Sequence, residues 1–196
     1  MQVFLIRHGK TQGNLEGRYV GSTDEPLCPL GAGELLGRAA PPVERLYSSP
    51  MRRCLQSAQL LYPRLAPIPV DGLRESDFGD FEYRTYEQLQ DCPAYRAWIA
   101  SGGRQAPPGG ETSEAFRRRC LGSFLQALAS CRKDGVERVA FLIHGGVMMA
   151  LLEMLADPLQ PFYHWQAKNG GGWAAQAVWR AGEAPPVRLS NCKKWE

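Results

Sequence analysis

The chain has 196 residues, a formal net charge of +3, 44% hydrophobic residues and 22% charged residues. This length suits one compact domain that can bury enough apolar surface to fold without disulfides or a metal. The composition excludes the collagen-like, coiled-coil and disordered classes, and the small, dispersed charge argues against nucleic-acid and membrane partners.

The cellular compartment is inferred mostly from targeting signals that the sequence lacks. Residues 1–6 are followed at once by Arg7 and His8, without the basic start, long apolar segment and cleavage site of a secretory signal. The longest apolar stretch, 147–156, contains Glu153 and is too short to span a bilayer. The six cysteines form no CxxC pair. We therefore expect reduced thiols in a cytoplasmic protein.

Strand and helix signals alternate through the first third of the chain. Residues 3–6 predict a short buried strand, residues 10–30 a loop, and residues 31–40 a helix that ends before a pair of prolines. Apolar residues at helical spacing then predict a helix over 52–65. The flanking short strands are expected at 46–49 and 66–71.

The rest of the chain continues the alternation after one interruption. Residues 72–112 are aromatic, acidic and broken by prolines, which predicts an insertion with one or two helices that forms a cap. Helices are expected at 113–133 and 147–156, and strands at 139–143, 173–179 and 187–189. Repeated strand–helix units predict a three-layer α/β/α sandwich with a mostly parallel sheet, and we expect residues 1–196 to form a single domain.

Two of the three histidines occupy matching positions in this pattern. His8 and His144 each end a predicted buried strand and precede a glycine. In open α/β sheets, ligands bind beyond the carboxyl ends of strands, so both imidazoles are expected to face one crevice. A single histidine at a strand end is more often structural, but two in equivalent contexts favour a functional site.

Basic residues accompany the first histidine. Arg7 adjoins His8, and Arg53 closely follows the second predicted strand. Because arginine presents a planar fork of donors, this pairing points to an anion such as phosphate. Thr11 and Asn14 add neutral donors, or they merely shape a turn. The triplet 117–119 is interpreted as solvated helix surface.

At this point the motifs resemble the signature of the histidine phosphatase superfamily, the phosphoglycerate mutase-like proteins. The first motif is Leu5–Asn14 (LIRHGKTQGN), and the later matches follow in the order of the family at 21–27, 48–58, 73–82 and 143–145. They span nearly the whole chain. The segments FGDFE (78–82), PGGET (108–112) and NGGGW (169–173) are similar to the alpha-ribazole phosphatase branch, which removes phosphate from alpha-ribazole 5′-phosphate in assembly of the cobalamin lower ligand.

The resemblance implies a role for each matching residue. His8 would be the nucleophile that forms a phosphohistidine. The oxygens of the phosphoryl group would be held by Arg7, Asn14, Arg53, His144 and Gly145. Glu75 would protonate the leaving group and later accept a proton from water, for which its pKa must be raised. No metal or other cofactor is then required.

Several assignments remain open from the residues alone. Asp77, Asp80 and Glu82 compete with Glu75 for the role of the acid. Arg52 competes with its neighbour Arg53, and His164, between two aromatic residues, fits packing or a pocket wall better than catalysis. The aromatic residues of the insertion form either its own core or an apolar wall for a heterocyclic leaving group. They are Phe78, Phe81, Tyr83, Tyr86 and Trp98.

Three positions depart from the usual family pattern. Lys10 stands where a glutamate or glutamine is common, Cys28 where threonine or serine often follows Pro-Leu, and Tyr83 where many relatives have glycine. Lys10 would add positive charge near the mouth of the site, and Tyr83 would narrow the side of the pocket that takes the leaving group. None removes a catalytic group, so these changes bear on the identity of the substrate.

The leading hypothesis is a metal-independent phosphomonoesterase that takes a small-molecule substrate and acts as a monomer or homodimer. A broad-range sugar or nucleotide phosphatase and a mutase are close alternatives, although mutases usually carry longer insertions. A non-catalytic phosphate-binding module is a different class of function, but the five catalytic candidates are all present. A metallohydrolase is disfavoured because adjacent arginines would repel a divalent ion.

Overall fold

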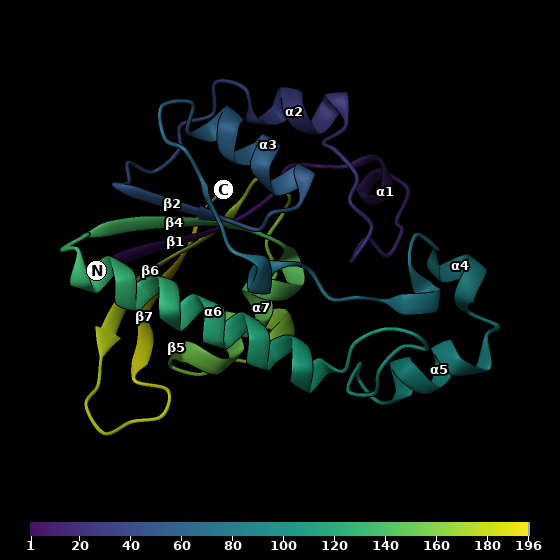
Figure 1. The fold of residues 1–196 in the computed structure, drawn as a ribbon. Helices are drawn as coiled ribbons and strands as arrows, with labels where there is room; N and C mark the ends of the chain where they lie inside the picture. The colour runs from purple at the N-terminus through teal and green to yellow at the C-terminus, as the bar shows by residue number, and fades with distance from the viewer. Residues whose placement is uncertain (196) are drawn as a thin grey trace.

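A mixed seven-stranded sheet forms the centre of the computed structural model, which describes residues 1–195 (Figure 1). The strand order is β3-β2-β4-β1-β6-β7-β5. The parallel part comprises β1 (Gln2–Arg7), β2 (Arg45–Ser48), β3 (Ile68–Pro69) and β4 (Arg138–Ile143). The remaining strands are β5 (Ala156–Asp157), β6 (Gly172–Trp179) and β7 (Val187–Trp195), of which β6 runs antiparallel to both β1 and β7.

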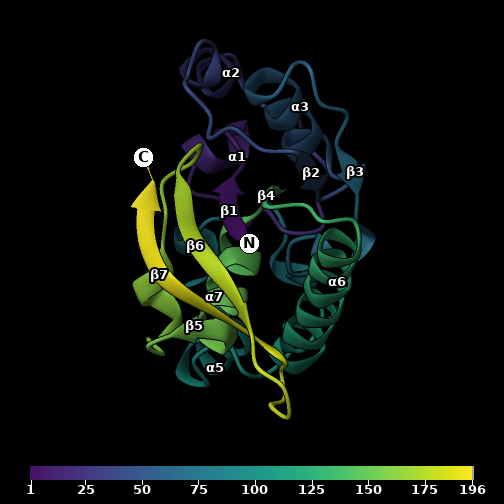
Figure 2. The same cartoon turned by 90° about the vertical axis from the view of Figure 1, so that its left-hand side faces the viewer.

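Helices cover both faces of this sheet, as the predicted three-layer fold requires (Figures 1 and 2). One face packs against α2 (Pro29–Leu35) and α3 (Arg52–Leu61), and the other against α6 (Ser113–Lys133) and α7 (Gly145–Leu155). Residues of β1 alternate between the two sides. Val3 and Leu5 belong to the core under α6 and α7, whereas Phe4 and Ile6 belong to the core under α2 and α3. The strand is therefore buried on both faces, and each fully buried large apolar side chain contributes about 1.5–3 kcal/mol to folding.

The segment expected to form a cap lies beyond the carboxyl ends of the parallel strands (Figure 1). The first element, η1 (Asp71–Leu73), instead packs against α6, with Leu73 in the main core. The part beyond the strands contains the short helices η2 (Gly79–Phe81) and α4 (Tyr86–Leu89), followed by α5 (Pro93–Ala100). Phe81, Leu89 and Tyr95 are buried together in a small core of its own. The aromatic residues of the insertion were expected to form either its own core or an apolar wall for a leaving group. Phe81 belongs to the core, whereas Tyr83 and Tyr86 are exposed.

Several predicted boundaries were wrong, and local backbone geometry explains the differences. The helix expected at 31–40 begins earlier, at Pro29, because Cys28 caps it by accepting a hydrogen bond from the amide of Gly31. It ends at Leu35 because Leu36 is extended and Gly37 has a φ of +72°. The helix expected over 52–65 ends at Leu61, shortly before Pro63.

Other elements were missed or shortened in the sequence analysis. The predicted loop 10–30 contains α1 (Gln12–Leu15), which is too short to show helical periodicity. The strand expected at 187–189 extends to Trp195 because its polar residues still pair with β6. Both β5 and the short helix η3 (Phe162–Trp165) were not predicted. All six cysteines are free thiols, and within residues 1–195 no helix combines the length and apolar character needed to cross a bilayer.

Candidate active site

His8 and His144 lie side by side because β1 and β4 are neighbouring parallel strands in register. Arg7 is opposite Ile143 in this pairing, so the next residue on each strand is a histidine. The amide of His8 donates to the carbonyl of Ile143 over 3.0 Å, and the two imidazole centroids are 5.2 Å apart. Both side chains are buried. The two histidines, far apart in the sequence, therefore meet as predicted, although they lie beneath the surface and not on the wall of an open crevice.

The hydrogen bonding of His8 determines which ring nitrogen can react. Nδ1 lies 2.7 Å from the carbonyl oxygen of Gly9, which can only accept a hydrogen bond. Nδ1 therefore carries the proton, and Nε2 keeps its lone pair. Burial lowers the pKa of His8 well below its usual value, and the charges of Arg53 and Arg7 lower it further. The ring is thus a neutral base with a free nucleophilic nitrogen at neutral pH.

Arg53 is the buried member of the pair Arg52–Arg53. Its side chain is 0% exposed and its Nε donates to Nδ1 of His144 over 3.2 Å, while Arg52 is exposed. Nε2 of His144 lies 2.8 Å from the hydroxyl of Ser49. Burial lowers the pKa of His144 well below its usual value, and Arg53 adds to the effect. The family spacing that favoured Arg53 over Arg52 therefore agrees with the geometry.

A loop held by Glu82 fixes the other end of Arg53. The guanidinium donates to the carbonyls of Gly21 and Thr23 over 2.9 and 2.7 Å. The carboxylate of Glu82 accepts hydrogen bonds from the backbone amides of Gly21, Ser22 and Thr23, and from the Thr23 hydroxyl. Because Glu82 is committed to this loop, it cannot be the acid near the histidines.

Arg7 approaches the same place from the end of β1. One of its terminal nitrogens donates to the carbonyl of Ala167 over 2.9 Å. Its Nε is buried and has no hydrogen-bond partner among residues 1–195. A buried unpaired donor on a charged group is costly, so this atom is available to an anionic ligand. Gly145 lies directly beside it, and a Cβ there would be 3.3 Å from the same Nε.

The carboxyl group of Glu75 lies against the start of α7. Its Oε2 accepts a hydrogen bond from the amide of Gly146 over 2.9 Å, and its Oε1 accepts one from the amide of Ser76. Burial raises the pKa of Glu75, opposed by these two hydrogen bonds and by the charges of Arg53 and Arg7. A carboxyl with a raised pKa beside a cationic site is suited to general acid catalysis.

The other acid candidates are placed differently. Oδ1 of Asp77 accepts hydrogen bonds from the Ser22 hydroxyl and from the amide of Gly79. Asp80 is exposed. Of the four carboxylates that competed for the role, only Glu75 lines the cavities described below.

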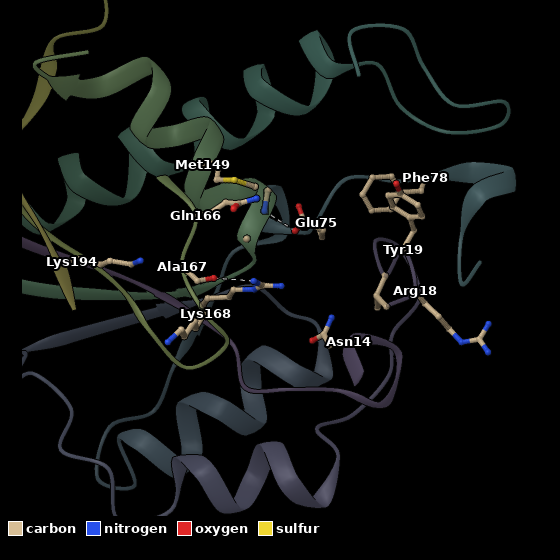
Figure 3. A pocket seen from close by; sticks show the side chains of 14 residues that line it. Asn14, Arg18, Tyr19, Glu75, Phe78, Met149, Gln166, Ala167, Lys168 and Lys194 are labelled. Carbon is tan, nitrogen blue, oxygen red and sulfur yellow. Dashed lines mark hydrogen bonds between the residues drawn. The ribbon is translucent and has the colours of Figure 1, made fainter. Parts of the chain in front are cut away.

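Asn14 lies in α1 and Thr11 directly precedes this helix, and the two differ in their exposure to the site. Thr11 is fully buried and caps α1, which makes it a turn-shaping residue. Oδ1 of Asn14 accepts hydrogen bonds from the Thr11 amide and from Nδ2 of Asn169. The carboxamide is thereby fixed at the edge of a cavity, opposite Glu75 (Figure 3).

Two connected cavities border the site: Glu75 lines both of them, and Arg7 and Asn14 line the first. The first, here the basic cavity, has a volume of about 530 Å³, and its lining includes four cationic residues and a single carboxylate, Glu75. Figure 3 shows Tyr19 and Phe78 together on one side of it and Lys168 and Lys194 on the other. The cationic residues are Arg7, Arg18, Lys168 and Lys194. His8, Arg53 and His144 are buried and are not among the residues that line it.

The second, here the aromatic cavity, has a volume of about 470 Å³ and lies between the cap, α6, α7 and η3. It shares Tyr19, Glu75, Phe78, Gly146 and Met149 with the basic cavity, so the two are continuous at Glu75. The remaining rings on its walls are Trp98, Phe116, Phe162 and Tyr163.

The comparisons with known proteins agree with this geometry. The family model for the histidine phosphatase superfamily (branch 1) matches residues 3–173. The chain belongs to the histidine phosphatase superfamily. This histidine phosphatase is 31% identical to the adenosylcobalamin/alpha-ribazole phosphatase of Salmonella typhimurium, with 89% of each chain covered. It is also 31% identical to the glucosyl-3-phosphoglycerate phosphatase of Mycobacterium tuberculosis, with 89% of this chain and 82% of the relative covered.

A solved structure adds the evidence of the fold. The alpha-ribazole phosphatase from Shigella flexneri superposes with a TM-score of 0.77 at 25% identity, covering 96% of this chain and 94% of that one. The likeness thus extends over nearly all of the histidine phosphatase. Together with the family model, it shows that the chain is a phosphatase enzyme with the α/β fold predicted from the sequence.

Some residues of the site escaped the sequence analysis. Asn169 donates to the carbonyl of His8, and the hydroxyl of Ser57 accepts from the amide of Gly9 and donates to the carbonyl of Arg53. Ser57 lies in the family motif at 48–58 and Asn169 in the motif NGGGW, so these motifs were the signal in the sequence that could have identified them. The interpretation of the triplet 117–119 as solvated surface was wrong for two of its members. Arg119 binds Glu111 and the carbonyl of Glu75, and Arg117 pairs with Glu153.

The expected effects of Lys10 and Tyr83 were also wrong. Lys10 forms an ion pair with Glu34 over 2.6 Å and lines neither cavity. Tyr83 is exposed, with a φ of +60°, and it too lies outside both cavities. His164 is exposed and packs against Trp165 and Trp173, in line with a packing role. Within residues 1–195, no three His, Cys, Asp or Glu side chains gather as a metal site.

Proposed function

We propose that this phosphatase hydrolyses phosphomonoesters through a phosphohistidine at Nε2 of His8, without a metal. The observation that carries the proposal is the 2.7 Å hydrogen bond from Nδ1 of His8 to the carbonyl of Gly9, because it leaves Nε2 unprotonated. The lowered pKa of the ring keeps that nitrogen neutral at the pH of the cell. A neutral imidazole is the form that can attack phosphorus.

In the first step, Nε2 of His8 attacks phosphorus and the bond to the ester oxygen breaks. Arg7, Arg53, His144, Asn14 and the amide of Gly145 hold the three remaining oxygens of the phosphoryl group. The buried Nε of Arg7 gains the acceptor that it needs. Positive charge from the protein offsets the charge that spreads over these oxygens in the transition state.

Glu75 completes both steps by moving one proton. In its protonated form, it gives the proton to the departing ester oxygen, so that a neutral alcohol leaves. In the second step, the Glu75 carboxylate takes a proton from a water molecule that attacks phosphorus, and the bond between phosphorus and Nε2 breaks. Inorganic phosphate leaves, and His8 and Glu75 return to their starting protonation states.

For the substrate, we propose alpha-ribazole 5′-phosphate. Support comes from the motifs FGDFE, PGGET and NGGGW, and from relatives in Salmonella typhimurium and Shigella flexneri that carry the name alpha-ribazole phosphatase. A broad-range phosphatase is the second candidate, because the glucosyl-3-phosphoglycerate phosphatase of Mycobacterium tuberculosis is equally identical to this chain. We further propose a cytoplasmic monomer or homodimer, in which the six thiols stay reduced and which has no nucleic-acid or membrane partner.

A phosphate-release assay with four substrates tests these assignments. The panel comprises alpha-ribazole 5′-phosphate, 3-phosphoglycerate, fructose bisphosphate and p-nitrophenyl phosphate, each with and without a chelator. We expect the highest kcat/KM for alpha-ribazole 5′-phosphate and no effect of the chelator. Comparable values for all four would favour the broad-range enzyme. Phosphate binding without any hydrolysis would contradict the proposal.

A further inference from the structure

The basic and aromatic cavities meet at the residue proposed as the proton donor. Glu75 lines both, with the hydrogen bond from Gly146 fixing its carboxyl at their junction. A general acid must lie between the phosphoryl group and the leaving group, because it protonates the oxygen that joins them. If the phosphoryl group occupies the basic cavity beside Arg7, the leaving group extends from Glu75 into the aromatic cavity.

The walls of the aromatic cavity are built from rings that hold one another in place. Tyr19 packs edge-on against Phe78 with centroids 5.3 Å apart, and against Trp98 with centroids 5.8 Å apart. Phe78 and Trp98 are themselves 6.1 Å apart. On α6 and η3, the guanidinium of Arg117 lies over the ring of Phe162 at 5.3 Å. Through these contacts the rings support one another and form an apolar surface on which a flat ring can stack.

The charges of the two cavities differ in a way that constrains the leaving group. The basic cavity has four cations against Glu75. The aromatic cavity has Arg104 and Arg117 against three carboxylates, and two of those carboxylates are already paired. Glu153 pairs with Arg117 over 2.7 Å, and Glu111 pairs with Arg119. A leaving group with its own carboxylate or phosphate would find fewer cations there than in the basic cavity, because of the two lining arginines only Arg104 has no ion pair within residues 1–195.

From these observations we propose that the aromatic cavity binds a planar, uncharged ring system carried by the leaving group, as in a nucleoside 5′-phosphate. The proposal rests on the phosphatase function described above. It adds that Trp98 of α5 and Phe162 of η3, which both line the cavity, determine specificity, and that acidic leaving groups such as glycerate are selected against. Aromatic stacking on a base changes binding by an amount that corresponds to about ten-fold or more in affinity.

The experiment compares substrates that differ only in the ring. The values of kcat/KM are measured for alpha-ribazole 5′-phosphate and for ribose 5-phosphate, which has the same phosphate ester and sugar without the base. We expect the ring to raise kcat/KM about ten-fold or more in the wild-type enzyme. Trp98→Ala and Phe162→Ala should each reduce this ratio several-fold, and Trp98→Phe should retain most of it. Ile99→Ala, an exposed neighbour on α5, serves as the matched control and should leave the ratio unchanged.

A second variant tests the argument from charge. Glu153→Gln releases the guanidinium of Arg117 from its ion pair and leaves the cavity more positive. This variant should raise kcat/KM for 3-phosphoglycerate several-fold. Because Trp98 also packs against Tyr95 in the core of the cap, circular dichroism and thermal melting accompany each variant. Phe162→Ala, in η3 and outside the core of the cap, keeps the test valid if Trp98→Ala fails to fold.

The outcomes separate this proposal from the phosphatase function itself. If wild-type enzyme hydrolyses ribose 5-phosphate as well as alpha-ribazole 5′-phosphate, or if folded Phe162→Ala or Trp98→Ala keeps the ratio of the wild type, the ring subsite is wrong and the phosphatase stands. If no ester releases phosphate and His8 takes up no label, the phosphatase function fails and the subsite fails with it.

Discussion

Arg53 donates a hydrogen bond from Nε to Nδ1 of His144 over 3.2 Å, and both side chains are 0% exposed. Because Arg53 can only donate, Nδ1 of His144 must be unprotonated, and the proton of the neutral ring lies on Nε2 towards Ser49. One buried guanidinium therefore fixes the protonation of the second histidine, and its charge also lowers the pKa of the first.

Replacing this guanidinium should cost stability as well as activity. Arg53→Met leaves Nδ1 of His144 and the carbonyls of Gly21 and Thr23 without their donor. Unpaired buried acceptors cost about 1–3 kcal/mol each, so we expect the free energy of unfolding in urea to fall by about 3 kcal/mol. Arg52→Met, at the exposed neighbouring position, should change it by less than about 0.5 kcal/mol. Equal effects of the two substitutions would show that the buried hydrogen bonds contribute little.

Glu82 should act on phosphate binding through the loop that it holds. Glu82→Gln removes the charge that the amides of Gly21, Ser22 and Thr23 share, and thereby loosens the carbonyls that position Arg53. Because charge-assisted hydrogen bonds are stronger than neutral ones, we expect inorganic phosphate to inhibit this variant with an inhibition constant about ten-fold higher than that of the wild type. The exposed Glu87 on α4 provides the control, Glu87→Gln. A variant at Glu82 with unchanged inhibition would show that the loop keeps its conformation without this carboxylate.

The role of Glu75 predicts a dependence on the leaving group. Glu75→Gln cannot protonate an ester oxygen, so kcat/KM, which reports only on the step that forms the phosphohistidine, should fall by about 10²–10⁴ for an alkyl phosphate such as ribose 5-phosphate. The fall for p-nitrophenyl phosphate should be much smaller, since p-nitrophenolate leaves without a proton. Asp80→Asn, at the exposed competing carboxylate, should affect neither substrate. A uniform loss for both substrates would contradict the role of Glu75 as the acid.

The two buried histidines should make stability depend on pH. Their pKa values are lowered in the folded enzyme, so below the usual value of 6.5 the unfolded chain binds protons that the folded chain does not. The stability from keeping the rings neutral is therefore present above pH 6.5 and lost as the pH falls towards the folded pKa values. Each histidine contributes a slope of at most about 1.4 kcal/mol per pH unit.

Urea unfolding between pH 5.5 and 7.5 measures this slope. His8→Asn should reduce it, and His164→Asn, at an exposed position, should not. An unchanged slope in His8→Asn would show that His8 titrates in the folded enzyme as it does in the unfolded chain.

The sequence predicted those parts of the site that follow directly from strand order. His8 and His144 could be placed together because each ends an apolar strand, and parallel strands present their carboxyl ends at one edge. The role of Glu75 could be assigned only through the family resemblance, because no local pattern distinguishes it from Asp77, Asp80 and Glu82. Only the fold shows that it meets the amide of Gly146, 71 residues away.

Contacts between distant loops could not be predicted in this way. The hydrogen bonds from Glu82 to residues 21–23 and from Arg119 to the carbonyl of Glu75 depend on how the cap is placed against α6. Helix ends show the same limit. Pro29 and Leu36 set the ends of α2 through local backbone geometry that hydrophobic spacing does not contain.

The central claim is that Nε2 of His8 carries the phosphoryl group during turnover. Its most direct test is a brief pulse with phosphate-labelled ester, followed by a denaturing quench and mapping of the label. We expect one label per active chain at His8, stable in alkali and labile in acid, and absent from His8→Asn. Turnover of His8→Asn at the rate of the wild type, or label on another residue, would contradict it.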